Sequence, residues 1–466
     1  MALKLTNTLT SRVEELEPLD GETVRMYACG PTVYDYCHIG NFRTFVFQDL
    51  LRRYIKYRGF ALKHVMNITD VDDKIIQSAL EAEVPIQEFT QPYIEAFFED
   101  MAKLQIEKPE LTPFATEHID EMVELVSKLE EKGHTYQSNG STYYRISTFP
   151  AYGKLSRVDL SESQGTDPTD ADEYTKENPR DFVLWKATKE EGEASWETPL
   201  GTGRPGWHLE CSTMSMKYLG ESFDIHCGGV DLIFPHHENE IAQSEAATDK
   251  PFVRHWIHSE FLQVEGEKMS KSRGNQFTLR DLIERGCDPL AVRYLLLSVH
   301  YRKQLNFTFE GVKRAESALQ RISDFLLRVG EVPDGQPENP ALTRQVAQTL
   351  QDFLAGLDED LNTSAALGSL FELIRSTNTL LDCQQVGAAN RDQILELFGE
   401  AHQIFAVFET SKHEVADDEI TGLIGQREQA RRDRDFQKAD EIRDLLLEKG
   451  IVLEDTKAGT RWKRAG

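Results

Sequence analysis

The stretch ACGPTVYDYCHIGN, residues 28–41, carries the chain from a strand into a helix. The strand-like segment TVRMYACG (23–30) precedes it, and the helix-like segment TFVFQDLLRRYIKYRG (44–59) follows. A helix start of this kind offers unpaired backbone N–H groups and a positive dipole end, which suit a phosphate. Gly40 lets a nucleotide approach the backbone closely, and His38 can donate to phosphate oxygens. Taken alone, a His-Ile-Gly triplet is more often explained by a histidine packed in the core.

The alternation of strand and helix continues outward from this stretch. ALKHVMNIT (61–69) is strand-like and is followed by the helical pattern VDDKIIQSALEAE (71–83). Further along, SFDIHC (222–227) and HWIHSEFLQV (255–264) are strand-like, and a helix begins between them near His236. This rhythm predicts an α/β fold with a parallel sheet of Rossmann type.

Composition divides the rest of the chain. Short β-like pieces and a long polar stretch between 112 and 202 predict an exposed insertion, and the pattern beyond 290 is helical throughout. A Pro/Gly-rich linker at 330–342 and an acidic linker at 413–421 interrupt it. We predict a Rossmann catalytic domain in two halves (1–111 and 203–300), a connective insertion (112–202), a segment at 301–332, an α-helical bundle (341–412) and a small C-terminal domain (420–466).

The net charge and the basic C-terminal residues bear on whether the protein binds nucleic acid. The formal net charge of −27 over 466 residues argues against non-specific nucleic-acid binding, because it repels the phosphate backbone. A local basic site is still possible at the tail TKAGTRWKRAG (456–466), where Trp462 lies among Arg461, Lys463 and Arg464 and can stack on a base. An ordinary solvated terminus is the alternative reading of that tail.

The same sequence features predict a location. The six cysteines are scattered without a C-x-x-C pair, so a disulfide framework is not expected. No run approaches the roughly 20 apolar residues of a membrane span, and the N-terminal segment lacks a secretory pattern. We therefore expect a cytoplasmic protein without a membrane partner.

A second motif, EGEKMSKSRGNQFTLRDLIE, occupies residues 265–284. Lys268 and Lys271 lie in a Ser/Gly-containing loop ahead of a helix that Thr278 is expected to cap, with Asp281 at the capping-box position. Two lysines on such a loop can neutralise a triphosphate as charge moves onto pyrophosphate. A solvated lysine loop is the ordinary alternative for a pair of this kind.

A third motif, FPHHENEIAQ (234–243), holds metal-capable side chains at a helix start. Residues four apart share a helix face, so His236 and Glu240 project together, whereas His237 pairs with Ile241. Zinc would need softer partners, and Cys29 and Cys211 are the candidates if both lie at the carboxyl edge of the sheet. Without further information, two distant cysteines are more often small core residues.

Two of these motifs resemble the signatures of class I aminoacyl-tRNA synthetases. HIGN at 38–41 departs from the HIGH pattern because Asn41 replaces the second histidine, and KMSKS at 268–272 matches its signature fully. Together with NITDVDDKI, RPGWHLECS and DIHCGGVDLIFPHHENEIAQ, they make essentially the whole chain resemble the cysteinyl-tRNA synthetase family.

The resemblance implies a set of site residues. One Zn²⁺ ion per chain would be bound by Cys29, Cys211, His236 and Glu240, and Mg²⁺ would accompany ATP. The ATP-binding residues would be His38, Gly40, Asn41, Lys268 and Lys271, all but Gly40 also catalytic. Cysteine would be bound by Cys29, Thr69, Trp207 and Asp231. Cys37 and Cys227 have no such role and are expected to be structural.

The resemblance also implies the reaction and its partners. L-cysteine would be activated with ATP and transferred to the terminal ribose of tRNA(Cys), with 301–332 contacting the stem and 420–466 reading the anticodon, in part through Arg461, Trp462, Lys463 and Arg464. We expect a monomer. One alternative is a cysteine ligase that acylates an amino sugar in low-molecular-weight thiol synthesis. A non-enzymatic, zinc-stabilised nucleotide-binding module is the other.

Overall fold

The computed structural model describes residues 2–158, 176, 178, 180–189, 192–270, 273–408, 417–433, 435–448, 451–456 and 459–464. The chain divides into two compact units, residues 1–408 and residues 409–466, each described by itself. None of the helices in these described ranges is long and apolar enough to cross a membrane.

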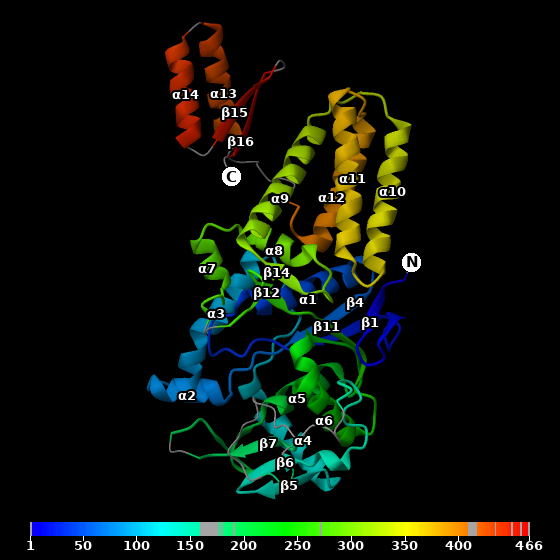
Figure 1. Ribbon diagram of the computed structural model, residues 1–466, viewed down its shortest axis with the longest axis vertical. Helices are drawn as coiled ribbons and strands as arrows, with labels where there is room; N and C mark the ends of the chain where they lie inside the picture. Colours follow the sequence, from blue (N-terminus) through cyan, green and yellow to red (C-terminus); the bar gives the residue numbers. More distant parts are fainter. Residues whose placement is uncertain are drawn as a thin grey trace. The chain divides into compact units, whose positions relative to one another are not determined.

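A four-stranded parallel sheet forms the centre of the first unit (Figure 1). Its strand order is β11-β10-β3-β4, with β3 at Thr23–Ala28, β4 at Ala61–Met66, β10 at Phe223–Gly229 and β11 at Val253–Ser259. Every residue of β10 is buried, as expected for a central strand covered on both faces. The predicted Rossmann-type sheet is therefore confirmed.

The chain crosses this sheet in two opposite directions. Helix α1 (Ile39–Tyr57) leads from β3 to β4, and helix α6 (Glu238–Thr248) leads from β10 to β11, toward the other edge. Because such crossovers are right-handed, the two helices cover opposite faces. The strand order thus reverses between β3 and β10, and ligands of such sheets bind at the carboxyl ends of the strands on either side of this point.

The region between the two halves of the sheet contains a second, antiparallel sheet. Its strand order is β5-β6-β7-β9-β8, formed by Thr135–Ser138, Ser141–Tyr144, Phe182–Ala187, Gly201–Pro205 and Trp196–Thr198. Helices α2 (Asp73–Glu81), α3 (Ile86–Lys103) and α4 (Ile119–Glu131) precede it, and α5 (Trp207–Leu219) returns the chain to β10. A hairpin of β1 (Lys4–Asn7) and β2 (Arg12–Glu15) begins the chain.

Beyond the parallel sheet the chain is mostly helical. A small sheet consists of β12 (Leu262–Val264), β13 (Glu267–Lys268) and β14 (Leu305–Phe307). Two helices, α7 (Leu279–Glu284) and α8 (Pro289–Ser298), lie between β13 and β14 in the sequence. The long helices α9 (Phe309–Gly330), α10 (Pro340–Asp358), α11 (Thr363–Asp382) and α12 (Ala388–Phe405) stand side by side as a bundle (Figure 1). The expectation of helices throughout was wrong at β14, which pairs with β12 as a parallel strand.

The second unit is small and has its own core. Helices α13 (Asp417–Arg432) and α14 (Phe436–Glu448) pack together and are followed by a hairpin of β15 (Ile451–Thr456) and β16 (Gly459–Arg464). The core consists of Ile424, Ile442, Leu446 and Ile451. Two expectations were wrong here: residues 417–421 of the predicted acidic linker belong to α13, and the C-terminal tail contains a strand.

Candidate metal centre and nucleotide site

Four metal-ligating side chains meet at the carboxyl edge of the parallel sheet, where the strand order reverses. Cys29 follows β3 directly, Cys211 lies on α5, His236 lies in the turn before α6, and Glu240 lies in the first turn of α6. One ligand atom of each lies within 4.8 Å of the others, and all four residues are buried. The structure thus brings together the four side chains that the sequence motifs suggested as a zinc site.

The spacing of these atoms fits a tetrahedral metal ion. The Cys29 Sγ–Cys211 Sγ distance is 3.8 Å, Cys29 Sγ lies 4.0 Å from Glu240 Oε1, and His236 Nε2 lies 3.1 Å from the same oxygen. Bonds of about 2.0–2.3 Å to tetrahedral zinc place neighbouring ligand atoms about 3.3–3.8 Å apart. Nε2 of His236 is buried and makes no hydrogen bond within the described part of the chain. A donor set of two thiols, one imidazole and one carboxylate therefore fits zinc.

Two further histidines hold these ligands in place. His208 Nδ1 lies 2.9 Å from His236 Nδ1, which directs the other ring nitrogen of His236 into the cluster. His226 Nε2 lies 2.9 Å from Glu240 Oε2, so the second carboxylate oxygen is engaged as well. The sequence analysis missed both residues. The spacing of His208 and Cys211, three apart on one helix, was a usable signal, whereas nothing in the sequence marks His226 within its strand.

His237, which the helix spacing paired with Ile241, also lies beside the cluster. Its Nε2 lies 3.5 Å from Cys29 Sγ and 3.9 Å from Glu240 Oε1. The prediction considered only residues four apart, but residues three apart also share a helix face. In addition, the backbone of Phe234 is extended (φ −138°, ψ 131°), so the turn at Ile233–His237 does not follow the regular geometry of α6.

Charge interactions favour ionised ligands in this cluster. Burial alone would raise the pKa of the Cys211 thiol, but the hydrogen bond to Cys29 and the neighbouring His236 outweigh it and lower the pKa to about 6. Burial would also raise the pKa of Glu240, yet His226 and His236 lower it to about 2. One thiolate and one carboxylate are thus stabilised, in part by His236, whose pKa Glu240 and Cys211 raise to about 10 although burial alone would lower it. Burial and the neighbouring Cys211 raise the pKa of the Cys29 thiol. Binding of a metal ion to this set would therefore release protons from His236 and Cys29.

The start of α1 forms a closed hydrogen-bonded cap. The Asn41 N–H donates to His38 Nδ1 (3.1 Å), and the His38 N–H donates to Asn41 Oδ1 (3.0 Å). Since Nδ1 accepts a hydrogen bond, the neutral imidazole carries its proton on Nε2. Asn41 uses its carbonyl oxygen in the cap, so its NH₂ group is the part that can donate to a ligand. Helix α1 therefore begins at Ile39, inside the stretch 38–41 where the sequence indicated a helix start and ahead of the helix-like run at 44–59.

The two nucleotide motifs lie against each other. The Ile39 N–H donates to the Phe277 carbonyl (2.9 Å), and His38 pairs with Thr278 as an isolated antiparallel bridge. Thr278 caps α7 with Asp281 as predicted. A Cβ atom placed on Gly40 would lie 2.6 Å from the Met269 methyl group, which shows that Met269 packs onto the helix start.

Of the two lysines in the second motif, Lys268 lies among the described residues. Lys268 ends β13 with an exposed side chain, and Lys271 lies outside the described residues. Asn275, which the sequence analysis did not single out, ties the loop together: it accepts from the Ser270 N–H (2.9 Å) and donates to the Lys268 carbonyl (3.2 Å).

The three residues suggested for binding the amino acid differ in their exposure and in their contacts with the metal cluster. Trp207 is 37% exposed and stacks on the His236 ring, with the two ring centroids 4.0 Å apart. Thr69 is buried and donates to Glu210 Oε2 (2.9 Å), so its hydroxyl proton is already used. Asp231 is exposed in the turn that follows β10. Trp207 thus contacts a ligand of the cluster directly.

The C-terminal basic residues lie on β16. The backbone of Trp462 pairs with Leu453, and Arg461 pairs with Glu454 across the hairpin. The side chains of Arg461, Trp462, Lys463 and Arg464 lie outside the described part of the structure.

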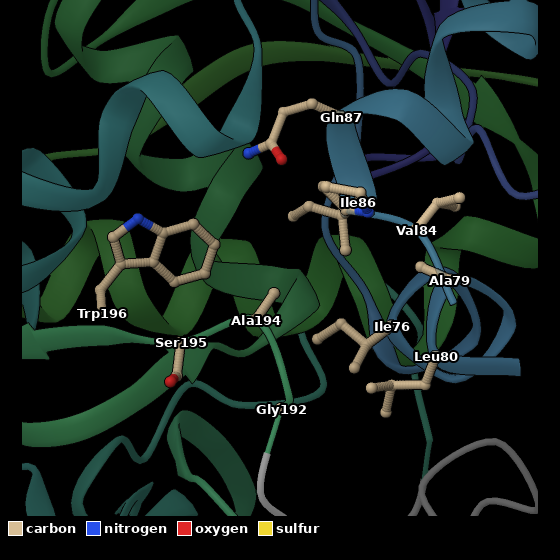
Figure 2. A pocket seen from close by; sticks show the side chains of 11 residues that line it. Ile76, Ala79, Leu80, Val84, Ile86, Gln87, Gly192, Ala194, Ser195 and Trp196 are labelled. Carbon is tan, nitrogen blue, oxygen red and sulfur yellow. The ribbon is translucent and has the colours of Figure 1, made fainter. Parts of the chain in front are cut away.

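A separate hollow of about 320 Å³ lies between the α2–α3 turn and the insertion (Figure 2). Ile76, Leu80 and Ile86 line one side of it and Trp196 faces them across the hollow. None of the described residues that line it is titratable. The described lining of this hollow therefore offers no acid, base or metal ligand.

Comparison with solved structures identifies the class of this fold. The Mycobacterium tuberculosis methionyl-tRNA synthetase in complex with methionyl-adenylate aligns with a TM-score of 0.60 at 17% identity, covering 82% of this chain and 89% of that chain. A LeuRS from Agrobacterium radiobacter aligns with a TM-score of 0.62 at 12% identity, covering 82% and 84%. The fold is that of a class I aminoacyl-tRNA synthetase.

Sequence comparison defines the family within that class. The model described as the tRNA synthetases class I (C) catalytic domain matches residues 15–317, the DALR domain matches 352–409, and the cysteinyl-tRNA ligase anticodon binding domain matches 414–462. The cysteine–tRNA ligase of Solibacter usitatus is 53% identical over the whole of both chains, and that of Brachyspira hyodysenteriae is 48% identical over 98% of each. The chain belongs to the cysteinyl-tRNA synthetase family.

Proposed function

We propose that this enzyme activates L-cysteine with ATP, transfers it to the 3′-terminal ribose of tRNA(Cys), and selects cysteine by coordinating its thiolate to zinc. The observation that carries the proposal is the buried set of Cys29, Cys211, His236 and Glu240 with ligand atoms within 4.8 Å of one another. In an apolar pocket, the exchange of sulfur for oxygen is worth only about 1–3 kcal/mol, too little to reject serine reliably. A metal–sulfur bond supplies the missing discrimination.

Zinc bound here would lower the pKa of the substrate thiol and favour sulfur over the harder hydroxyl oxygen. The chain's own residues do the rest of the selection. His236 is fixed by His208, Glu240 is fixed by His226, and the indole of Trp207 covers the imidazole of His236 from the solvent side. We assign Asp231 to the α-ammonium group of the bound cysteine and Thr69 to the wall of its pocket.

The activation step forms one bond and breaks one. A carboxylate oxygen of cysteine attacks the α-phosphorus of ATP, the bond from that phosphorus to the bridging oxygen breaks, and pyrophosphate leaves with the electron pair. His38, through Nε2–H, and Asn41, through its amide group, donate to the phosphate oxygens at the start of α1. Lys268 and Lys271 stabilise the departing negative charge, and Mg²⁺ accompanies ATP for the same reason.

In the second step the terminal ribose hydroxyl of the tRNA attacks the activated carbonyl, and AMP leaves. We assign residues 301–332 to the stem of the tRNA and residues 420–466 to the anticodon, with the domain boundaries as predicted from the sequence. Arg461, Trp462, Lys463 and Arg464 are the candidate contacts. The monomeric state and the cytoplasmic location also stay predictions.

The alternative of a ligase that acylates an amino sugar is less well supported. Such an enzyme has no use for an anticodon-binding domain, and the match to that domain over 414–462 favours tRNA as the acceptor. Membership of a ligase family likewise argues against a non-enzymatic nucleotide-binding module.

A charging assay tests the proposed function. Purified, zinc-loaded enzyme is incubated with ATP, deacylated tRNA and either cysteine or serine. Charging with cysteine and not with serine supports the proposal, whereas pyrophosphate exchange without charging, together with acylation of an amino sugar, would favour the alternative. Cys211→Ala should abolish cysteine activation, and Cys227→Ala, a matched change at another buried cysteine, should leave it intact.

A further inference from the structure

The buried cluster contains a second complete set of metal ligands. Cys29, His226, His237 and Glu240 also have ligand atoms within 4.8 Å of one another, and all four are buried. This set shares Cys29 and Glu240 with the set proposed above and differs by two histidines in place of Cys211 and His236. One thiol, two imidazoles and one carboxylate are again a donor set that suits zinc.

The ligand atoms of this second set lie close enough together to surround one ion. Cys29 Sγ lies 3.5 Å from His237 Nε2, and His237 Nε2 lies 3.9 Å from Glu240 Oε1. His226 Nε2 lies 2.9 Å from Glu240 Oε2, and its other ring nitrogen has no hydrogen-bond partner among the described residues. Tetrahedral zinc requires about 3.3–3.8 Å between such atoms, so a small adjustment suffices.

A chain of hydrogen bonds behind His237 orients its ring toward the cluster. His237 Nδ1 lies 2.8 Å from His258 Nε2, and His258 Nδ1 lies 2.7 Å from Thr8 Oγ1. Gly228 leaves room for the ring, because a Cβ atom there would lie 2.7 Å from His237 Cε1. Outer partners of this kind fix the orientation of a ligating imidazole.

The two sets differ in depth. The first lies beside Trp207, which is 37% exposed, whereas in the second the ring of His226 stacks on Trp256, which is 1% exposed, with the centroids 4.6 Å apart. The second set is therefore farther from the side on which a substrate thiol would arrive. We call it the inner position and the first set the outer position.

We propose that the inner position is a second zinc site, overlapping the outer one, that holds the ion when Cys211 is not a ligand. The inference rests on the proposed function only in taking zinc as the resident ion. Because both positions need Cys29 and Glu240, a chain holds one ion at a time. When Cys211 is not a ligand, His226 and His237 then retain the ion together with Cys29 and Glu240. Selection of cysteine depends on Cys211 and His236.

The test compares two neighbouring histidines in a background without Cys211. Zinc per chain and zinc affinity are measured, by dialysis and by competition with a chromophoric chelator, in Cys211→Ala and in the same variant carrying either His236→Gln or His237→Gln. We expect Cys211→Ala to keep about one zinc ion, unaffected by His236→Gln. Adding His237→Gln should weaken zinc binding by about 100-fold. Loss of an outer hydrogen-bond partner can already lower metal affinity by this much, and loss of a ligand should cost at least as much. The reverse ranking would show that zinc stays with the remaining outer ligands, and would overturn the proposal.

Control measurements separate this inference from the proposed function. If the unaltered enzyme binds no zinc, the proposed mode of selection fails; if it binds zinc and Cys211→Ala does not, only the inner position fails. Thermal unfolding checks that each variant is folded, and His226→Gln in the same background replaces His237→Gln if the latter is not.

Discussion

Replacing Gly40 by alanine should separate catalysis from stability at the start of α1. The new Cβ atom would lie 2.6 Å from the Met269 methyl group and 3.0 Å from the His38 ring, where ordinary contact begins at 3.4 Å. These groups must therefore move apart by about 0.8 Å and about 0.4 Å, respectively. The displacement falls on the KMSKS loop and on the imidazole that we assign to the phosphates. A misplacement of about 1 Å costs on the order of 100-fold in rate.

The stability of the variant should change little. Alanine is a better helix former than glycine by up to about 1 kcal/mol, and Met269 is a flexible side chain that can give way. Cysteine-dependent pyrophosphate exchange and thermal unfolding are measured side by side. Gly368→Ala, at an exposed helical position with nothing within 4 Å of the new Cβ atom, is the matched control; it should leave the exchange rate unchanged and raise the unfolding temperature slightly. A Gly40→Ala variant with an unaltered exchange rate would refute the assignment of this helix start to the nucleotide.

Three further predictions concern the metal, a buried carboxylate and pH. Removing zinc with a chelator should abolish cysteine activation, and adding Zn²⁺ but not Mg²⁺ should restore it; activity of the metal-free enzyme would contradict this. Glu238→Gln should lower the free energy of unfolding, measured by denaturant titration, by about 3 kcal/mol. The reason is that the Glu238 carboxylate accepts hydrogen bonds from the N–H groups of Gly153, Leu155 and Ser156. A loss under about 1 kcal/mol would contradict this prediction. Burial and then Arg52 lower the pKa of His64 to about 3, so near and below pH 6.5 only the unfolded state takes up this proton. Between pH 6.5 and 5 the wild type should therefore lose about 1.6 kcal/mol more of its free energy of unfolding than His64→Gln. Equal losses would show that His64 is protonated in the fold.

Much of the sheet domain could be predicted because its signals are local. The strands at 23–30, 61–69 and 222–227 and the cap at Thr278 follow from apolar runs and short capping patterns. The strand β14 could not be predicted in the same way. β14 has three residues and pairs with β12 across more than forty positions of sequence, and such long-range pairing leaves no periodic trace.

In the metal cluster, the contacts within one helix could be predicted from the sequence, whereas the contacts between distant elements could not. The pairing of His236 with Glu240 follows from helix spacing, but the approach of Cys29 to Cys211 depends on a parallel sheet and a helix meeting at one edge. The roles of His226 and His258 depend on burial beside Trp256, which the sequence of their strands does not reveal. Long-range partners of this kind become visible only when the strand order is known.

Direct observation of sulfur binding by the metal tests the central claim most sharply. Cobalt is exchanged for zinc in the intact enzyme, and the sulfur-to-cobalt absorption is recorded as cysteine or serine is added without ATP. The account predicts that cysteine increases this absorption, because its thiolate joins Cys29 and Cys211 at the ion, and that serine leaves it unchanged. The same spectrum with both amino acids, in an enzyme that charges tRNA with cysteine, would contradict selection of cysteine through the metal.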